Sequence, residues 1–484
     1  MKLKRILAAF LAVATLMSAT ACSGETTSSV TSEPTSSVTS EESKNESSEA
    51  ETSASESSTT ETSAPETTTT TKAPETEAPE TTTTTKAPET EATETTTTTT
   101  TKAPETPAPE TTTTTKAPET EKPEESKPLE KSEMTDKINT FKMTEDNAKH
   151  IGRTYTDSDG TVWLSHSASA LEFTFTGTKA SVTVCEDIVY SAGNEPRFAV
   201  YVNDERVEDV LLKEKEKTID FYSADKAKET KVKIIKLSEA ANSIFGVKSV
   251  SANTTNLVPT AKKALKIEFI GDSITCGYGV DDEVKENHFS TATEDATRAY
   301  AYKTAMNLDA DYSLVSFSGH GIISGYTSTN VKQSDQIVSK YYEDVARNYS
   351  GSKIVQNDWD FSRFTPDIIV INLGTNDNSY VKKDKEKEKE YEAGYIEFLK
   401  QVRAKNPDAY IVCTLGVMGN ELFFAMRRAA NQYKEETGDT KVESMLFTTQ
   451  TASDGYAADW HPTEKTHTKA ATRLTTFIEE LLAQ

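Results

Sequence analysis

The first part of this 484-residue chain lacks the residues that build a hydrophobic core. Positions 25–130 contain no Phe, Trp or Tyr, yet they hold 11 of the 16 prolines and 23 Glu against 7 Lys. A segment this polar and acidic cannot bury enough apolar surface to offset the entropy lost on ordering. We therefore expect residues 23–139 to form a long disordered stalk, followed by about 345 residues of folded protein.

Positive charge and cysteine are also scarce. The chain has 53 Lys and Arg against 77 Asp and Glu, so it offers no basic face, and we exclude nucleic acid as a partner. Three of the four cysteines, Cys185, Cys276 and Cys413, follow the stalk, and their odd number and spacing fit neither a disulfide framework nor a zinc site. The sequence has no HExxH motif and no phosphate-binding glycine loop. We expect free thiols, no metal and no cofactor.

The N-terminus has the pattern of an export signal. Lys2, Lys4 and Arg5 precede an apolar run, residues 6–17, which ends in the small residues Ser-Ala-Thr-Ala before Cys22. The run is too short to span a membrane, so residues 1–22 are predicted to be a signal peptide. Small residues before a lone cysteine resemble a bacterial lipobox, in which Cys22 is lipidated. An ordinary secretory signal with an incidental cysteine is the alternative.

The stalk consists largely of repeats. Between Thr67 and Thr120 the unit TTTTTKAPETEAPE recurs, with Pro and Glu breaking the threonine runs. This composition forms no helix, suits O-glycosylation and keeps the chain extended. It would lift a cargo away from a surface anchor, or serve only as a linker between modules. We expect an exported monomer, either a bacterial cell-surface lipoprotein that meets the membrane only through its lipid, or a secreted protein.

Residues 140–256 alternate apolar and polar residues in short runs. Such runs lie at 171–175, 180–184, 198–202 and 231–235. Short alternating strands at this spacing, separated by turn signals, are typical of antiparallel sandwiches. The pattern predicts a β-sandwich of the jelly-roll kind over 140–256.

After Pro259, short apolar runs alternate with longer amphipathic stretches. The expected strands are 265–270, 312–317, 367–373, 409–415 and 442–448. The expected helices are 296–307, 331–345, 384–403, 421–436 and 462–482. This alternation predicts a parallel sheet with helices on both faces, a three-layer α/β/α domain over 262–484. Ligands of such sheets bind beyond the carboxyl ends of the strands.

Polar motifs follow three of these strands and precede the last helix. They are GDSIT at 271–275, SGHG at 318–321, GTND at 374–377 and DWHP at 459–462. A serine on a tight turn after a strand, with a histidine on another loop of the same edge, is the arrangement that nucleophilic acyl transfer requires.

Together the four motifs supply the roles that this chemistry needs. Ser273 is the candidate nucleophile, and His461 is the base that takes its proton. Asp459 can hold the second ring nitrogen of the histidine. The backbone N–H groups of Ser273 and Gly319, with the side-chain amide of Asn376, can form the oxyanion hole.

These motifs resemble a known family. GDSI at 271–274, Gly319, GTND at 374–377 and His461 are similar, in the same order, to the four signature blocks of the SGNH (GDSL-type) hydrolases. That resemblance implies a flavodoxin-like domain over 262–484. With the sandwich before it, the folded part resembles carbohydrate esterase family 2, whose members join a jelly roll to an SGNH domain. They remove acetyl groups from plant cell-wall polysaccharides such as xylan and glucomannan.

One position departs from the superfamily. Its acid usually lies three residues before the histidine, where this chain has Ala458. Asp459, two residues before, fits carbohydrate esterase family 2, in which some members orient the histidine through a backbone carbonyl instead. Both possibilities stay open from the sequence.

The expected activity is that of an exported serine esterase, of the acetyl xylan esterase type, acting on acetylated polysaccharide or oligosaccharide. Trp460 and His320 are candidate substrate contacts, although core packing or a solvated loop would also account for them. One alternative is an esterase for O-acetylated peptidoglycan or short-chain lipid esters. Another is a surface glycan-binding lipoprotein without activity, against which the intact Ser273, Asn376 and His461 argue.

Overall fold

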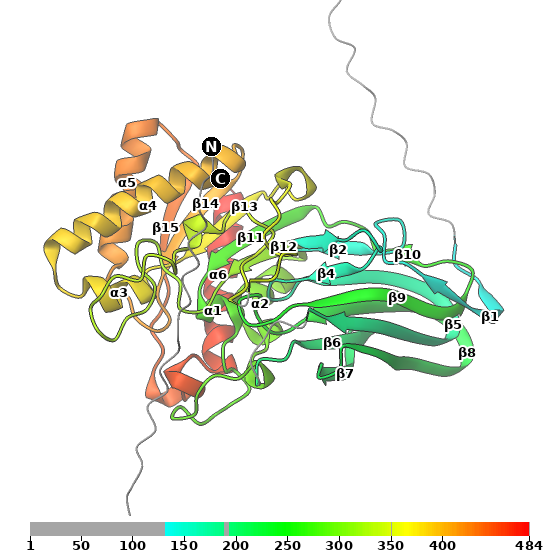
Figure 1. Cartoon of the computed structure of the whole chain (residues 1–484). Coiled ribbons are helices and arrows are strands. Elements are labelled where there is room, and N and C mark those ends of the chain that lie inside the picture. The colour runs from blue at the N-terminus through cyan, green and yellow to red at the C-terminus, as the bar shows by residue number, and fades with distance from the viewer. Residues whose placement is uncertain (1–130, 188–192, 350, 484) are drawn as a thin grey trace, which may run out of the picture. The chain divides into compact units, whose positions relative to one another are not determined.

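The computed structural model describes residues 131–187, 193–349 and 351–483. The predicted signal peptide, the candidate lipidation site Cys22 and the Thr/Pro/Glu repeats lie outside these residues. Figure 1 shows a β-rich region, coloured cyan to green, followed along the chain by an α/β region coloured green to red. No helix within the described ranges is long and apolar enough to cross a membrane.

The β-rich region is an antiparallel sheet of ten strands, which confirms the predicted class of this domain. The strands are β1 (Met134–Phe141), β2 (Lys149–Ile151), β3 (Thr154–Thr156), β4 (Val162–Leu164), β5 (Ala170–Glu186), β6 (Arg197–Val202), β7 (Glu205–Leu211), β8 (Glu216–Lys236), β9 (Phe245–Thr254) and β10 (Val258–Pro259). The two longest, β5 and β8, pair along most of their length. Strand β9 pairs with the second half of β5, and β6 pairs with the second half of β8. The long β5–β8 pair therefore joins the other strands into one sheet.

Two details of this domain differ from the sequence expectation. The runs 171–175 and 180–184 belong to the single strand β5, because the chain at Gly177 makes a register shift rather than a reversal. Asn253 Oδ1 accepts the N–H groups of Thr178 and Lys179 there, at 2.8 and 2.9 Å. Strand β1 begins at Met134, inside the segment predicted to be stalk. Its apolar residues Met134 and Ile138 are both exposed, so β1 lacks the buried apolar alternation from which the other strands were predicted.

The α/β region contains the predicted parallel sheet. Its strands are β11 (Leu265–Gly271), β12 (Ala310–Ser316), β13 (Ile368–Asn372), β14 (Tyr410–Leu415) and β15 (Val442–Leu446). Their order is β12-β11-β13-β14-β15, so the chain moves to one side of β11 and then returns to the other. Gly271, the last residue of β11, pairs with Ser316 on one side and with Asn372 on the other. The three loops that follow therefore meet at one edge, at the switch point where such sheets bind ligands.

Helices cover both faces of this sheet. They are α1 (Ser273–Cys276), α2 (Tyr300–Asn307), α3 (Thr375–Val381), α4 (Lys385–Lys405), α5 (Phe423–Thr437) and α6 (Glu464–Leu482). Side chains of α4 and α5 share one buried cluster with Ile369 and Ile411, while α2 and α6 share another with Ile368 and Val412. Alternate residues of the strands thus face opposite helix layers, and the three-layer α/β/α architecture is confirmed.

The predicted helix at 331–345 is wrong. Only a short 3-10 turn, Val338–Lys340, forms in this segment. Its backbone instead pairs with the loop after β12, because Gly321 N donates to Gln336 O at 3.1 Å and Val338 N donates to Gly321 O at 3.0 Å. Of the apolar residues that suggested a helix, Val338 and Tyr342 are buried in the same cluster as α4 and α5, while Val331 is exposed.

Candidate active site

Ser273 stands on a tight turn at the end of β11. Asp272 caps the short helix α1 and accepts the N–H of Ile274 at 3.0 Å. A Cβ at Gly271 would lie 2.0 Å from Thr275 Oγ1, so only glycine allows the turn to close this tightly. Burial raises the pKa of Asp272 to about 7. The turn fixes Ser273 at the carboxyl end of β11.

His461 lies within hydrogen-bonding distance of Ser273, as the sequence predicted. Its Nε2 is 2.9 Å from Ser273 Oγ, although 188 positions separate the two residues. The second nitrogen, Nδ1, is 3.2 Å from the carbonyl oxygen of Ala458. Because a carbonyl can only accept, Nδ1 carries the proton and Nε2 is free to accept from the serine. Burial lowers the pKa of His461 to about 4, so the ring is neutral near pH 7.

The Asp459 carboxylate does not hold the histidine ring. It accepts hydrogen bonds from Tyr278 Oη at 2.6 Å, from the ring of His288 at 2.9 Å, and from Phe289 N at 3.1 Å. Burial alone would raise the pKa of Asp459, but these bonds outweigh it and the pKa lies below its usual value. Of the two alternatives left open by the sequence, the backbone carbonyl is the one that contacts the imidazole.

Tyr278 is a site residue that sequence reasoning missed. Its ring stacks on His461, with centroids 3.9 Å apart and an interplanar angle of 21°. Its hydroxyl is the group that binds Asp459. Thus Asp459 acts on the histidine through Tyr278 and through the turn that it occupies. No spacing pattern indicates this contact, because Tyr278 lies in the loop after α1 and far from Asp459 along the chain.

The turn before His461 has a strained backbone. His461 N donates to Ala458 O at 3.1 Å, and the two central residues, Asp459 and Trp460, have φ of 49° and 63°. Positive φ at both positions is the geometry of a type I′ turn, which normally takes Asn, Asp or Gly. Trp460 is 52% exposed, next to the Tyr456 ring and beneath the Lys285 ammonium, which is 4.6 Å from the indole centroid. The turn therefore presents a half-exposed aromatic side chain at the residue before His461.

Gly319 and Asn376 also reach this edge of the sheet. Gly319 has φ of 74°, and a Cβ on it would meet nothing within 4 Å, so open space lies beside its backbone. The Asn376 amide donates to the carbonyl of His320 at 2.8 Å and to Asp272 at 3.2 Å. Asn376, which follows β13, thereby connects to the loops that follow β11 and β12.

Asp377, the last residue of the GTND motif, holds the SGHG loop in place. Its buried carboxylate accepts the backbone N–H groups of Ile322, Ile323 and Ser324 at 2.8 to 3.1 Å. Burial raises the pKa of Asp377 to about 6, against the effect of these bonds. The motif itself could be seen in the sequence, but this structural role of its aspartate could not.

His320 is not open to a substrate, which corrects the expectation for this residue. It is fully buried, and burial lowers its pKa to about 3. Its Nδ1 is 2.9 Å from the Ser318 carbonyl, and its Nε2 contacts the Arg347 guanidinium. The His320 ring therefore stabilises the loop after β12 and is not exposed to solvent.

A loop of the β-rich domain also reaches the active site. Glu239, between β8 and β9, accepts the N–H of Ser318 at 2.8 Å and lies 3.8 Å from Cys276 Sγ. Glu239, Cys276 and Glu294 form the one group in the described ranges whose potential metal-ligand atoms lie within 4.8 Å of one another. Buried Lys236 donates to the carbonyls of Ser238 and Glu239 beside them. Burial raises the pKa values of the Glu239 and Glu294 carboxyl groups, which favours their neutral forms over metal-binding carboxylates, so we assign no metal here.

The three cysteines after the stalk are free thiols, as expected. Burial raises the pKa of Cys276 well above its usual value, which keeps that thiol protonated.

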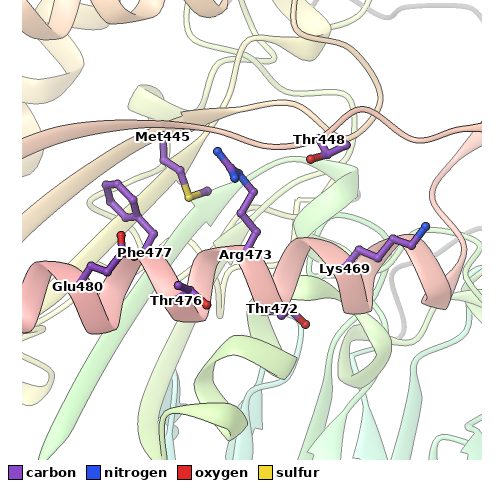
Figure 2. A pocket seen from close by; sticks show the side chains of 8 residues that line it. All are labelled: Met445, Thr448, Lys469, Thr472, Arg473, Thr476, Phe477 and Glu480. Carbon is purple, nitrogen blue, oxygen red and sulfur yellow. The ribbon is translucent and has the colours of Figure 1, made fainter.

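A separate hollow of about 560 Å³ lies between α6 and the edge strand β15. Figure 2 shows its lining, in which Met445, Arg473 and Phe477 come from these two elements. None of the site residues described above lines this hollow.

Comparisons with known proteins agree with this geometry. Residues 269–469 match the GDSL-like lipase/acylhydrolase family, and residues 150–260 match the carbohydrate esterase 2 N-terminal domain. Cellulase/esterase CelE of Acetivibrio thermocellus is 32% identical over 321 residues, which cover 65% of this chain and 37% of CelE. The chain thus spans little more than a third of that relative. An acetylxylan esterase / glucomannan deacetylase of Cellvibrio japonicus is 24% identical over 345 residues, covering 71% of this chain and 91% of the relative.

A solved structure extends the match to both domains. The family two carbohydrate esterase from Clostridium thermocellum, in complex with cellohexaose, aligns with a TM-score of 0.62 and 30% identity. The alignment covers 69% of this chain and 99% of that chain. Since both of its domains are matched and in the same order, this chain belongs to carbohydrate esterase family 2, a family of carboxylic-ester hydrolases.

Proposed function

We propose that this protein is an exported serine esterase that removes O-acetyl groups from plant cell-wall polysaccharides such as xylan and mannan or glucomannan. The hydrogen bond of 2.9 Å between His461 Nε2 and Ser273 Oγ is the observation that carries the proposal. A neutral imidazole with its free nitrogen on a serine hydroxyl is a general base placed on a nucleophile.

The reaction proceeds in two halves. Ser273 Oγ attacks the acetyl carbonyl carbon as its proton passes to His461 Nε2, and the carbonyl π electrons move to the oxygen. When the tetrahedral intermediate collapses, the bond to the sugar oxygen breaks, and His461 returns the proton to that oxygen. Water, deprotonated by His461, then attacks the acetyl carbonyl carbon of acetyl-Ser273. When this second tetrahedral intermediate collapses, the bond to Ser273 Oγ breaks, His461 returns the proton to Oγ, and acetic acid leaves and ionises to acetate. The Ala458 carbonyl stabilises the imidazolium that forms in each half.

The oxyanion is stabilised by fixed donors in this scheme. They are the backbone N–H groups of Ser273 and Gly319 and the side-chain amide of Asn376. Both hydrogens of that amide have protein acceptors, and the longer bond, 3.2 Å to Asp272, is the one to be exchanged for the oxyanion.

The exposed indole of Trp460, the residue before His461, is the proposed platform for a sugar ring. Maintaining a bulky residue at positive φ costs stability, which supports a role in binding rather than in folding. The names of the relatives support acetylated xylan and glucomannan as substrates.

Acetate release from acetylated xylan, acetylated glucomannan and phenyl acetate tests the proposal. We expect activity on all three, and Ser273→Ala should reduce kcat at least about 10³-fold without altering thermal stability. Ser453→Ala, a change at an exposed serine, serves as the matched control. Wild-type rates in Ser273→Ala would refute the nucleophile. Faster release from O-acetylated peptidoglycan or from short-chain lipid esters would transfer the proposal to those substrates.

Export and anchoring are part of the same proposal. Cys22 follows the predicted signal, and the acidic repeats would separate the esterase from the envelope. Radiolabelled palmitate should be incorporated by the wild type and not by Cys22→Ser. Without incorporation, the protein would be a secreted esterase instead.

A further inference from the structure

The peptide group between Ser318 and Gly319 carries one of the proposed oxyanion donors. In a trans peptide the carbonyl of the first residue and the N–H of the second lie in one plane and point in opposite directions. A group that fixes the Ser318 carbonyl therefore fixes the direction of the Gly319 N–H as well.

Two side chains hold the carbonyl of this peptide, and a third holds the peptide before it. His320 Nδ1 lies 2.9 Å from the Ser318 carbonyl, and Tyr349 Oη donates to the same oxygen at 3.3 Å. In the preceding peptide, between Phe317 and Ser318, Glu239 accepts the N–H of Ser318 at 2.8 Å. The next carbonyl, that of Gly319, accepts the N–H of Tyr326 at 2.8 Å. The imidazole provides the shortest side-chain bond to the carbonyl that shares a plane with the donor.

The partners of His320 determine its tautomer. The Ser318 carbonyl can only accept, so Nδ1 must carry the proton, and the Arg347 guanidinium can only donate, so Nε2 must present its lone pair. Arg347 is itself held between Tyr341 and Tyr349, 4.4 and 5.0 Å from their ring centroids, and donates to Asp335 O at 2.9 Å. Burial keeps the imidazole neutral, which leaves both hydrogen bonds in place over the working pH range.

We propose that His320 is a positioning residue for the oxyanion hole. With its tautomer set by Arg347, it holds the Ser318 carbonyl and so directs the Gly319 N–H toward the oxygen of the tetrahedral intermediate. This inference rests on the proposed esterase function.

Two variants of similar size test the role. In His320→Asn the amide nitrogen takes the place of Nδ1 and can still donate to the Ser318 carbonyl, whereas His320→Leu cannot donate. With phenyl acetate, we expect His320→Leu to lower kcat about tenfold or more at a nearly unchanged KM. This is less than the roughly 10²–10³-fold loss of kcat that follows removal of a whole oxyanion donor, because the Gly319 N–H is misdirected rather than removed. His320→Asn should remain within about threefold of wild type, since the donor is kept. Equal kcat values for the two variants would overturn the proposal, whether both are high or both are low.

A second measurement does not depend on the folding of these variants. Nitrogen NMR of the ¹⁵N-histidine-labelled wild-type protein should show one imidazole, absent from His320→Asn, with Nδ1 protonated and Nε2 unprotonated. Arg347→Met should shift that ring toward a mixture of tautomers and lower kcat with little effect on KM. A ring protonated at Nε2 in the wild type would also overturn the proposal. If wild-type protein releases no acetate, the proposed function fails; if wild type is active but His320→Leu keeps its kcat, only this inference fails.

Discussion

The imidazole of His461 is buried under Tyr278, and this burial lowers its pKa to about 4, while the Ala458 carbonyl acts in the opposite direction. A general base must be neutral, so the enzyme loses activity as pH falls through this pKa. We expect kcat/KM for phenyl acetate to rise through about pH 4 and to be level well below pH 6.5, the usual pKa of histidine. A pH–rate profile measures this directly, and an acid limb centred near 6.5 would contradict it.

Asp459→Asn is the control for that profile. The Asp459 charge raises the pKa of His461, so its removal should move the acid limb to lower pH without abolishing activity. The carbonyl of Ala458 keeps the ring oriented in this variant. A loss of activity comparable to that of Ser273→Ala would mean that the carboxylate takes a direct part in proton transfer.

At the scale of the element, the turn at 458–461 holds Trp460 in a strained backbone conformation, which the proposed role of Trp460 in sugar binding would explain. Trp460 has φ of 63°, a conformation that glycine adopts without cost and that other residues adopt at a cost of about 1–2 kcal/mol. Trp460→Gly should therefore be about 1 kcal/mol more stable than Trp460→Ala, which keeps the strain, as judged by urea unfolding. Both variants remove the indole, so both should raise KM for acetylated xylan to the same extent and leave KM for phenyl acetate nearly unchanged. Wild-type KM for xylan in both would exclude Trp460 from substrate binding.

Elements with a strong local pattern were predictable from the sequence, and elements that depend on distant partners were not. All five parallel strands lie where apolar runs indicated them, and four of five predicted helices formed. Segment 331–345 has apolar spacing of the same kind, but its backbone bonds to the loop after β12, a partner that no local pattern reveals. The same distinction holds in the site. Ser273 and His461 follow from strand-end motifs, while Tyr278 and Glu239 arrive from loops whose positions depend on the whole fold.

At the scale of the molecule, the β-rich domain is part of the active site rather than a separate module. Ala240, Ala241 and Ile244 of its 237–244 loop share a buried cluster with residues of the parallel sheet. Within that loop, Glu239 accepts the N–H of Ser318, next to the proposed oxyanion donor at Gly319. Contact between the two domains thus helps to position the loop that carries the proposed oxyanion donor.

Substitutions at Glu239 test whether catalysis depends on the contact between the β-rich domain and the loop after β12. Burial raises the pKa of its carboxyl group, so the acceptor oxygen matters more than the negative charge. We expect Glu239→Gln, which keeps an acceptor for Ser318, to retain kcat within about fivefold, because one hydrogen bond of this kind is preserved. Glu239→Leu leaves the Ser318 N–H buried without that acceptor and should lower kcat at least about tenfold more than Glu239→Gln does, through misplacement of the neighbouring donor. Thermal unfolding of both variants separates this effect from a general loss of stability. Equal kcat in the two folded variants would show that the β-rich domain supports the catalytic loop only through packing.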